Sequence, residues 1–433
     1  MMAKVCFEYR DGVLHAESVA LPRLADEFRT PLYVYSVAAL ENAFGEFSNA
    51  FEGQDTLIAY SVKANSNQSV IGVLSGLGAG ADVVSEGELK RALLAGVPGN
   101  RIVFSGVGKT EAELAAGLRA GVHQFNLESE AQLRLLSDVA QQIGREARIA
   151  IRVNPDVDAG THDKIATGRK ADKFGVPIDM GCELYQIAAA LPAIKVVGVD
   201  LHIGSQLTEL SPFGAAFMRL ADLIKQLTDL GHQISQIDIG GGLGVCYENE
   251  QPPSADDYAR LVKETLGHFG CQIILEPGRV LVAGSGILLC RVIEVKKTLD
   301  NRFIIVDAAM NDLLRPALYD AWHSIEPVME ADEGSYSELV DIVGPVCESG
   351  DILGRARKLP PLSSGDLLAI RSAGAYGAVM SSSYNTRPPA AEVLVHESKF
   401  SVIRPRLELD ALIGLDCVPD WLSVADDIIG EDR

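Results

Sequence analysis

The feature that most constrains the fold is a unit that recurs between residues 36 and 280, in which a short apolar run precedes a helical pattern. The apolar runs span 57–62, 81–84, 101–104, 123–127, 148–153, 196–203, 236–239 and 272–275. Eight strand–helix units over roughly 250 residues are expected of a closed (β/α)8 barrel. An open doubly wound sheet is the alternative, but the glycine-rich segment 240–244 comes too late for an opening dinucleotide fingerprint. We therefore predict a TIM-type α/β barrel.

Several of the predicted helices have recognisable starts and ends. Ser85, Thr110 and Ser129 each precede a Glu or Gln three residues later, which is the pattern of a capping box. Ser211-Pro212 predicts an N-cap followed by a first-turn proline, and Gly121 is expected to end a helix. These signals place helices between the strands, as the barrel requires.

The pattern changes after about residue 281. Strand-like runs at 287–295, 302–306, 339–343, 367–370 and 391–395 follow one another without regular helices between them. The first 35 residues also have β character, with Asp11-Gly12 as a hairpin turn. We predict a barrel domain over 36–280, and a second, mostly antiparallel β-domain built from both chain termini, 1–35 and 281–433.

Composition narrows the class of partner. A formal net charge of −21 argues against nucleic acid and an anionic membrane surface, because both require a basic face. The densest apolar run, 280–290, is interrupted by glycine and serine and is too short to span a bilayer. The first eight residues lack the charged-then-apolar layout expected of a secretory signal, and seven cysteines without close pairs suggest neither a disulfide framework nor a zinc site. We expect a cytoplasmic protein without a metal.

Polar residues follow the ends of the predicted strands, where a barrel of this type carries its active site. Lys63 follows the first strand, and desolvation at that position predicts a lowered amine pKa and a nucleophile that can form a Schiff base. A lysine that extends past the strand into water is the alternative. The other strand-end residues are Asp82, Ser85, Asn126, Glu128, Arg152, Asn154, His202, Ser205, Gly240, Gly241, Gly242, Glu276, Gly278 and Arg279.

The glycine turn, His202 and Glu276 have two interpretations each. The glycines 240–242 would let backbone N–H groups approach a phosphate, or they form a tight turn. His202 could stack on an aromatic cofactor, or be a hydrogen-bonded core histidine. Glu276 follows a buried strand and needs a cationic partner, which is either Arg279 or a protonated ring nitrogen of a cofactor.

A lysine nucleophile, a phosphate-binding turn, a flat ring and a carboxylate are the parts that hold pyridoxal 5′-phosphate. The motifs YSVKAN at 60–65, LHIGS at 201–205, GGG at 240–242 and EPGR at 276–279 resemble those of the group IV, alanine-racemase-fold decarboxylases. KFG at 173–175, CESGD at 347–351 and GAYG at 374–377 narrow the resemblance to the diaminopimelate decarboxylases. The resemblance covers nearly the whole chain. One departure is Pro389, where the family pattern has a basic residue.

The resemblance implies a role for each matching residue. Lys63 would carry the cofactor, His202 would stack on its ring and Glu276 would pair with the ring nitrogen. The implied cofactor-binding set is Lys63, His202, Ser205, Gly240, Gly241, Gly242, Glu276, Gly278, Arg279 and Tyr376. The implied substrate-binding set is Arg279, Arg315, Tyr319, Glu348 and Tyr376. Cys347 would be the proton donor, and Cys347 and Glu348 would come from the neighbouring subunit of a homodimer.

The function implied by the resemblance is that of a carboxy-lyase. It would convert meso-2,6-diaminopimelate to L-lysine and CO2, the last step of lysine biosynthesis by the diaminopimelate route. Arg279, Arg315 and Glu348 favour this substrate, since a distal carboxylate needs guanidinium partners and a distal ammonium needs a carboxylate. The alternatives are a decarboxylase of the same group for another diamino acid or carboxy-polyamine, and a cofactor-binding regulator without turnover.

Overall fold

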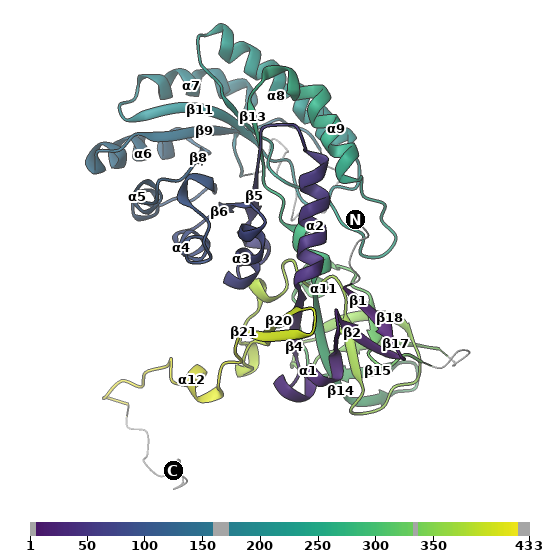
Figure 1. Ribbon diagram of the computed structural model, residues 1–433. Helices are drawn as coiled ribbons and strands as arrows, with labels where there is room; N and C mark the ends of the chain where they lie inside the picture. The colour runs from purple at the N-terminus through teal and green to yellow at the C-terminus, as the bar shows by residue number, and fades with distance from the viewer. Residues whose placement is uncertain (1–5, 159–172, 332–336, 423–433) are drawn as a thin grey trace.

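The computed structural model describes residues 6–158, 173–331 and 337–422. A barrel wrapped by helices forms one part of the molecule and a β-rich body forms the other, and both ends of the chain contribute to the second (Figure 1). Helix α2 (Val37–Ala50) directly follows β4 (Leu32–Ser36) of the β-rich body and runs from there to the barrel (Figure 1). The predicted combination of a barrel with a mostly antiparallel β-domain is confirmed, whereas the domain boundaries at 35/36 and 280/281 stay a prediction.

The barrel is a closed ring of eight parallel strands, and each overlaps one of the runs expected from the sequence. The strands are β5 (Thr56–Ser61), β6 (Gly80–Val83), β7 (Ile102–Phe104), β8 (Gln124–Leu127), β9 (Ala147–Asn154), β11 (Ile194–Leu201), β12 (Gln236–Asp238) and β13 (Gln272–Leu275). Neighbours pair in this order, and β13 pairs with β5 to close the ring. The short β10 (Val176–Pro177) adds to β9.

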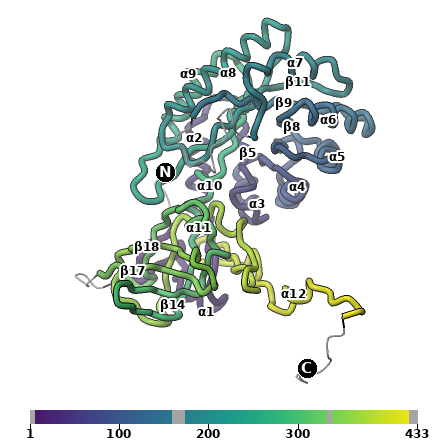
Figure 2. The backbone as a smooth tube through the Cα atoms, turned by 180° about the vertical axis from the view of Figure 1, so that it is seen from behind, coloured from purple at the N-terminus to yellow at the C-terminus, as the bar shows by residue number. Residues whose placement is uncertain are grey.

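Helices follow the strands and cover the outside of the ring, as the view from behind shows (Figure 2). They are α3 (Gln68–Gly76), α4 (Glu86–Leu94), α5 (Glu111–Ala120), α6 (Glu130–Ile143), α7 (Gly181–Ala190), α8 (Ser211–Asp229), α9 (Ala255–Leu266) and the short α10 (Arg279–Val282). The alternation of strand and helix is therefore the one that the hydrophobic pattern predicts.

The predicted helix signals are confirmed in part. Thr110 forms the full reciprocal capping box of α5, and Gly121 ends that helix at φ 66°. Ser85 and Ser129 each accept the N–H three residues on, as N-caps do, but the side chains of Glu88 and Gln132 accept from the residue before the cap, so the predicted box is half formed at both helices. The prediction for Ser211 is wrong: α8 begins at Ser211, and its N-cap is Leu210, which has no capping side chain. Proline in the first turn fixes the backbone angle there without a cap.

The second body is a mixed sheet in which antiparallel pairs predominate. Its strand order is β18 (Ile352–Leu359), β17 (Glu338–Val343), β15 (Arg302–Val306), β14 (Gly286–Lys297), β4, β20 (Ala391–His396) and β21 (Lys399–Arg404), with β19 (Leu367–Ile370) and β16 (Ile325–Pro327) paired beside β14. Only β4 with β20 and β15 with β17 are parallel among the described strands of this sheet. Two short helices, α11 (Arg315–Tyr319) and α12 (Leu409–Ile413), complete it.

The N-terminal segment packs against this sheet. Strands β1 (Phe7–Arg10) and β2 (Val13–Ala16) form the predicted hairpin, and Asp11 and Gly12 have the positive φ angles of 50° and 75° that such a turn requires. Strand β3 (Val19–Ala20) adds to β2, and helix α1 (Leu21–Phe28) follows it. The sequence pattern did not predict α1.

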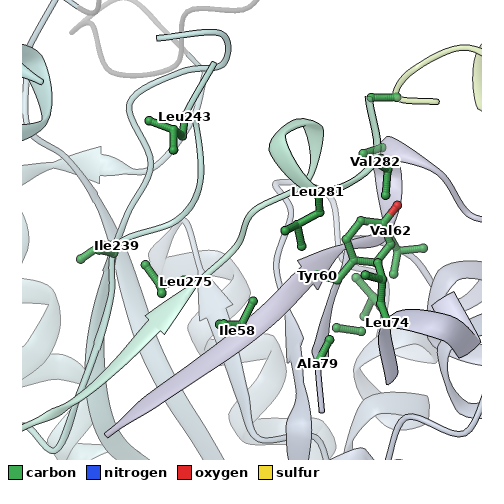
Figure 3. Close-up of a cluster of buried hydrophobic side chains, with 14 of the residues drawn as sticks. Ile58, Tyr60, Val62, Leu74, Ala79, Ile239, Leu243, Leu275, Leu281 and Val282 are labelled. Carbon is green, nitrogen blue, oxygen red and sulfur yellow. The ribbon is translucent and has the colours of Figure 1, made fainter. Parts of the chain in front are cut away.

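The alternation of side chains along β5 determines which of them face the inside of the barrel near the carboxyl ends of its strands. Leu57 and Ala59 pack inside the barrel with residues of β7 and β13. Ile58 and Tyr60 point the other way and belong to the large hydrophobic core, which includes residues of the helices around the barrel (Figure 3). Ser61 continues the inward-facing series, and its hydroxyl donates to Asp82 of β6 at 2.7 Å. Lys63, two residues further on, lies in a single 3-10 turn over Val62–Ala64.

The buried carboxylate of Glu17 connects three segments of the chain, and the first prediction tests its contribution to stability. Oε1 of Glu17 accepts hydrogen bonds from the Ser36 hydroxyl at 2.7 Å and the Ala38 N–H at 3.0 Å, and its other oxygen accepts from the Glu397 N–H. Glu17→Ala should lower the free energy of unfolding by at least about 1.5–3 kcal/mol, the contribution of one hydrogen bond to a charged group. Denaturation followed by circular dichroism measures this change.

A matched control is Glu27→Ala, because Glu27 is exposed on the neighbouring helix α1. Its effect should stay within about 0.5 kcal/mol, as for most surface substitutions. Equal stability of the two variants would contradict the connecting role of Glu17.

Candidate active site

A cavity of about 760 Å³ lies at the carboxyl ends of the barrel strands. Among the residues predicted from the sequence, those that line it are Lys63, Arg152, His202, Ser205, Gly240, Gly241, Gly242, Glu276, Gly278, Arg279, Arg315, Tyr319 and Tyr376. The volume is in the ordinary range for sites of small ligands and cofactors. The predicted residues outside this lining are the strand-end residues Asp82, Ser85, Asn126, Glu128 and Asn154 and the later residues Cys347 and Glu348.

Lys63 is held at the rim by a carboxylate. Its Nζ lies 3.6 Å from Oδ2 of Asp82, the same oxygen that accepts from Ser61. Burial lowers the pKa of Lys63, but the acidic groups of Asp82, Tyr376 and Glu276 outweigh it and raise the pKa above the usual value. The prediction of a lowered pKa is therefore wrong, because it considered the strand end without the neighbouring strand that supplies Asp82.

Glu276 lies in the interior of the barrel without the arginine that the sequence offered as its partner. Its Oε1 accepts hydrogen bonds from Ser105 at 3.2 Å and from the Asn126 amide at 3.3 Å. Burial raises the pKa of the Glu276 carboxyl well above the usual value, and the nearby acids Asp238 and Asp82 raise it further. A carboxyl in such surroundings favours a proton or a cationic partner at its free oxygen.

The three glycines after β12 are a steric requirement of the turn. A Cβ atom on Gly241 would lie 2.2 Å from the Glu276 carbonyl oxygen, and one on Gly242 would lie 2.6 Å from that of Gly204. Gly240 and Gly242 also have φ angles of 63° and 118°, which favour glycine. The tight turn is thus present, and it exposes backbone along the wall of the cavity, where a phosphate could approach closely.

His202 has the properties of a neutral ring at the cavity wall. Its Nδ1 accepts a hydrogen bond from the Gly241 N–H at 3.1 Å, which requires that this nitrogen carry no proton. Burial lowers the pKa of His202 well below the usual value, and the positive charges of Arg152 and Lys63 lower it further. The imidazole can therefore present its flat face to a cofactor without adding a charge.

Two buried arginines, Arg279 and Arg315, also line the cavity. Arg279 donates from Nη1 to the Tyr247 hydroxyl at 2.8 Å and from Nη2 to the Ser205 hydroxyl at 3.0 Å, and its guanidinium lies 4.9 Å from the ring centre of Tyr376. Arg279 therefore does not serve as the partner of Glu276. The Arg315 guanidinium lies 4.8 Å from the Tyr247 ring centre, and burial lowers its pKa.

Cys347 and Glu348 lie on an exposed loop between β17 and β18. Asp351 holds the loop by accepting from the N–H groups of Met310 at 2.6 Å and Val346 at 2.8 Å. The Asn385 side chain accepts from the Cys347 N–H at 3.1 Å. Both side chains thus face outward on a well-supported loop instead of into the cavity of their own chain.

Sequence reasoning missed several residues that shape the site. Ser105 follows the third strand, and its hydroxyl reaches Glu276, but serine after a strand is too common to attract notice. Tyr247 lies in an irregular loop with no periodic signal. Lys109 is buried, donates to the carbonyls of Gly106 and Asn126, and has its pKa lowered to about 8 by burial.

Comparison with known proteins agrees with this geometry. Residues 37–283 match the family model described as pyridoxal-dependent decarboxylase, pyridoxal binding domain. The chain is 51% identical to a diaminopimelate decarboxylase of Pseudomonas aeruginosa over 400 residues, which are 92% of this chain and 96% of that protein. The crystal structure of diaminopimelate decarboxylase from Helicobacter pylori complexed with L-lysine has a TM-score of 0.88 and 43% identity, covering 91% and 98% of the two chains. The M. jannaschii enzyme structure has a TM-score of 0.93 and 37% identity, covering 98% and 100%.

Fold, cavity and comparisons together define an enzyme that uses pyridoxal 5′-phosphate, and the chain belongs to the pyridoxal-dependent decarboxylase family. Within that family it is one of the diaminopimelate decarboxylases, as the sequence motifs indicated.

The residues of the cavity fit this cofactor. A primary amine, a glycine turn without room for Cβ atoms, a neutral imidazole and a buried carboxyl all line the cavity. They match the aldehyde, the phosphate, the ring face and the ring nitrogen of pyridoxal 5′-phosphate respectively.

The second prediction concerns the residue that holds the cofactor. Purified enzyme should absorb near the visible edge, and borohydride should attach the cofactor permanently to the peptide that contains Lys63, because Lys63 is the one lysine among the described residues that lines the cavity. Peptide mapping by mass spectrometry identifies the labelled residue. Lys109→Arg serves as a control and should keep the label on Lys63; label on any other lysine would contradict the assignment.

Proposed function

We propose that this enzyme decarboxylates meso-2,6-diaminopimelate to L-lysine and CO2, acting as a cytoplasmic homodimer with shared active sites. The observation that carries the choice of substrate is the pair of buried arginines, Arg279 and Arg315, on the wall of a cavity that also holds Lys63 and Glu276. A second carboxylate on the substrate explains two guanidinium groups whose charges would otherwise repel each other. In the described part of the chain, no helix is long and apolar enough to cross a membrane.

The residues divide into those for the cofactor and those for the substrate. Lys63 would hold the cofactor through Nζ, and His202 would lie against its ring. Pyridoxal 5′-phosphate, when bound, supplies an electron sink for the pair left at the α-carbon after CO2 departs. Glu276 would favour the protonated ring nitrogen, because its buried carboxyl among other acids favours a nearby positive charge. Gly240–Gly242, Ser205, Gly278, Arg279 and Tyr376 would hold the phosphate.

The distal end of the substrate is bound by groups from two chains. Arg279, Arg315 and Tyr319 bind the distal carboxylate, and Tyr376 contacts both phosphate and substrate. Glu348 of the partner subunit faces the distal ammonium. Cys347 of the partner subunit donates a proton to the α-carbon. The exposure of both residues on their own chain supports their use by a neighbour.

The third prediction tests Arg315 as a reader of the distal carboxylate. Arg315→Ala should lower kcat/KM for diaminopimelate roughly 10- to 150-fold, because a hydrogen bond to a charged group contributes about 1.5–3 kcal/mol. The product L-lysine retains the distal carboxylate, whereas cadaverine lacks it. Inhibition by L-lysine should therefore weaken by a similar factor while inhibition by cadaverine changes little.

Steady-state kinetics with both inhibitors measure these changes. An equal loss for L-lysine and cadaverine would show that Arg315 supports the structure of the site without reading the carboxylate. Absence of CO2 release from diaminopimelate by the unmodified enzyme would reject the proposed function itself and favour a non-catalytic, cofactor-binding role.

The fourth prediction tests the shared site. Lys63→Ala and Cys347→Ala should each be inactive alone, and should complement when mixed under conditions that allow subunit exchange. In a heterodimer, one site carries both defects and the other carries neither, by the symmetry of a two-fold interface. Random reassortment should restore about one quarter of the activity. No recovery despite exchange, demonstrated by differently tagged subunits, would mean that each chain builds its own site.

A further inference from the structure

A histidine behind the cavity has no role in the chemistry described so far. His323 follows α11 and is fully buried, with 0% of its surface exposed. Its Nε2 lies 3.1 Å from Nε of Arg315, and its Nδ1 lies 2.8 Å from the carbonyl oxygen of Arg371. The ring thus lies between the guanidinium of a cavity residue and the backbone of the β-domain.

These two contacts determine where the proton of His323 resides. An arginine Nε can only donate, so Nε2 of His323 must accept, and Nδ1 carries the proton that goes to the Arg371 carbonyl. Burial lowers the pKa of His323 to about 3, and the charge of Arg315 contributes in the same direction. His323 is therefore a neutral acceptor of fixed tautomer throughout the ordinary pH range.

The Arg315 side chain is held from a second direction by an aromatic ring. Its guanidinium lies 4.8 Å from the Tyr247 ring centre, and the Tyr247 and His323 rings meet edge-on, with centres 5.2 Å apart at 71°. Tyr247 also accepts from Arg279, so the same ring contacts both arginines. A long, flexible side chain is thereby confined to one orientation before any ligand arrives.

We propose that His323 is a positioning residue for recognition of the distal carboxylate, and that it acts by holding Nε of Arg315. Because Nε is engaged, a carboxylate can form a two-point contact only with the terminal nitrogens Nη1 and Nη2, the end-on arrangement of the guanidinium fork. His323 thus selects the direction from which Arg315 meets the substrate. This inference rests on the proposed role of Arg315 in binding diaminopimelate.

Two substitutions separate hydrogen bonding from packing. His323→Phe keeps an aromatic ring against Tyr247 but removes the acceptor, whereas His323→Gln keeps an oxygen that can accept from Arg315. His323→Phe should raise KM for diaminopimelate and weaken inhibition by L-lysine at least about 10-fold, the lower limit for a lost hydrogen bond to a charged group. Cadaverine inhibition and kcat should change less than about 3-fold. His323→Gln should stay within a few-fold of the unmodified enzyme in all of these measurements.

A double-mutant cycle provides a further criterion. In an Arg315→Ala background, His323→Phe should have little additional effect on the ratio of L-lysine to cadaverine inhibition, because the residue through which it acts is gone. Thermal denaturation and cofactor absorbance of each holoenzyme variant report whether folding is retained. If His323→Phe does not fold, His323→Leu, which also removes the acceptor, takes its place in the cycle, and His323→Gln stays the control that keeps it.

The outcomes distinguish this proposal from the proposed function. Suppose that Arg315→Ala weakens inhibition by L-lysine selectively, as expected. Equal weakening of L-lysine and cadaverine inhibition by His323→Phe would then overturn the positioning role alone. If Arg315→Ala itself fails to discriminate between the two ligands, the assignment of Arg315 is wrong, and the role of His323 falls with it. A selective loss for L-lysine that Gln restores would support the proposal.

Discussion

Closure of the barrel is the constraint on which the active site depends. Strand β13 pairs with β5 through the register of Ile273–Leu275 with Thr56–Ile58, and the Ser61 N–H continues the ladder by donating to the Pro277 carbonyl at 3.0 Å. This pairing brings Glu276, from the end of the barrel sequence, to the rim that carries Lys63, from its beginning. Without closure, the amine and the carboxyl that we propose as the two partners of one cofactor would lie at opposite edges of a sheet.

Buried acids determine the electrostatics of that rim. Asp82 holds the amine of Lys63, while Asp238 accepts from Asn126 at 2.9 Å, and the same amide donates to Glu276. Burial and the charge of Asp82 raise the pKa of Asp238 to about 7, and burial with the charges of Asp238 and Asp82 raises that of Glu276 well above the usual value. Such a cluster stabilises positive charge at its open side, which suits a cofactor whose ring nitrogen must remain protonated.

Local patterns in the sequence predicted the barrel and the strand-end residues of the cavity wall, because strand period and strand-end position are local properties. Contacts between elements were not accessible in this way. The pKa of Lys63 depends on Asp82 of a neighbouring strand, and the partners of Arg279 depend on Tyr247, which belongs to an irregular loop. The missing cap at Ser211 has a different cause: proline in the first turn makes the capping hydrogen bond dispensable.

The fold orders two parts of the proposed site in different ways: the arginines for the distal carboxylate, and the loop that would enter the neighbouring subunit. At the distal end, neutral acceptors and aromatic rings confine arginines that already belong to the cavity. On the outer loop, Asp351 and Asn385 fix the backbone at Cys347 before any neighbouring chain arrives. A loop ordered in this way loses little conformational freedom when it enters a second active site, so that association of two chains need only bring existing surfaces together. Preorganisation within one chain would thus lower the cost of sharing an active site between two.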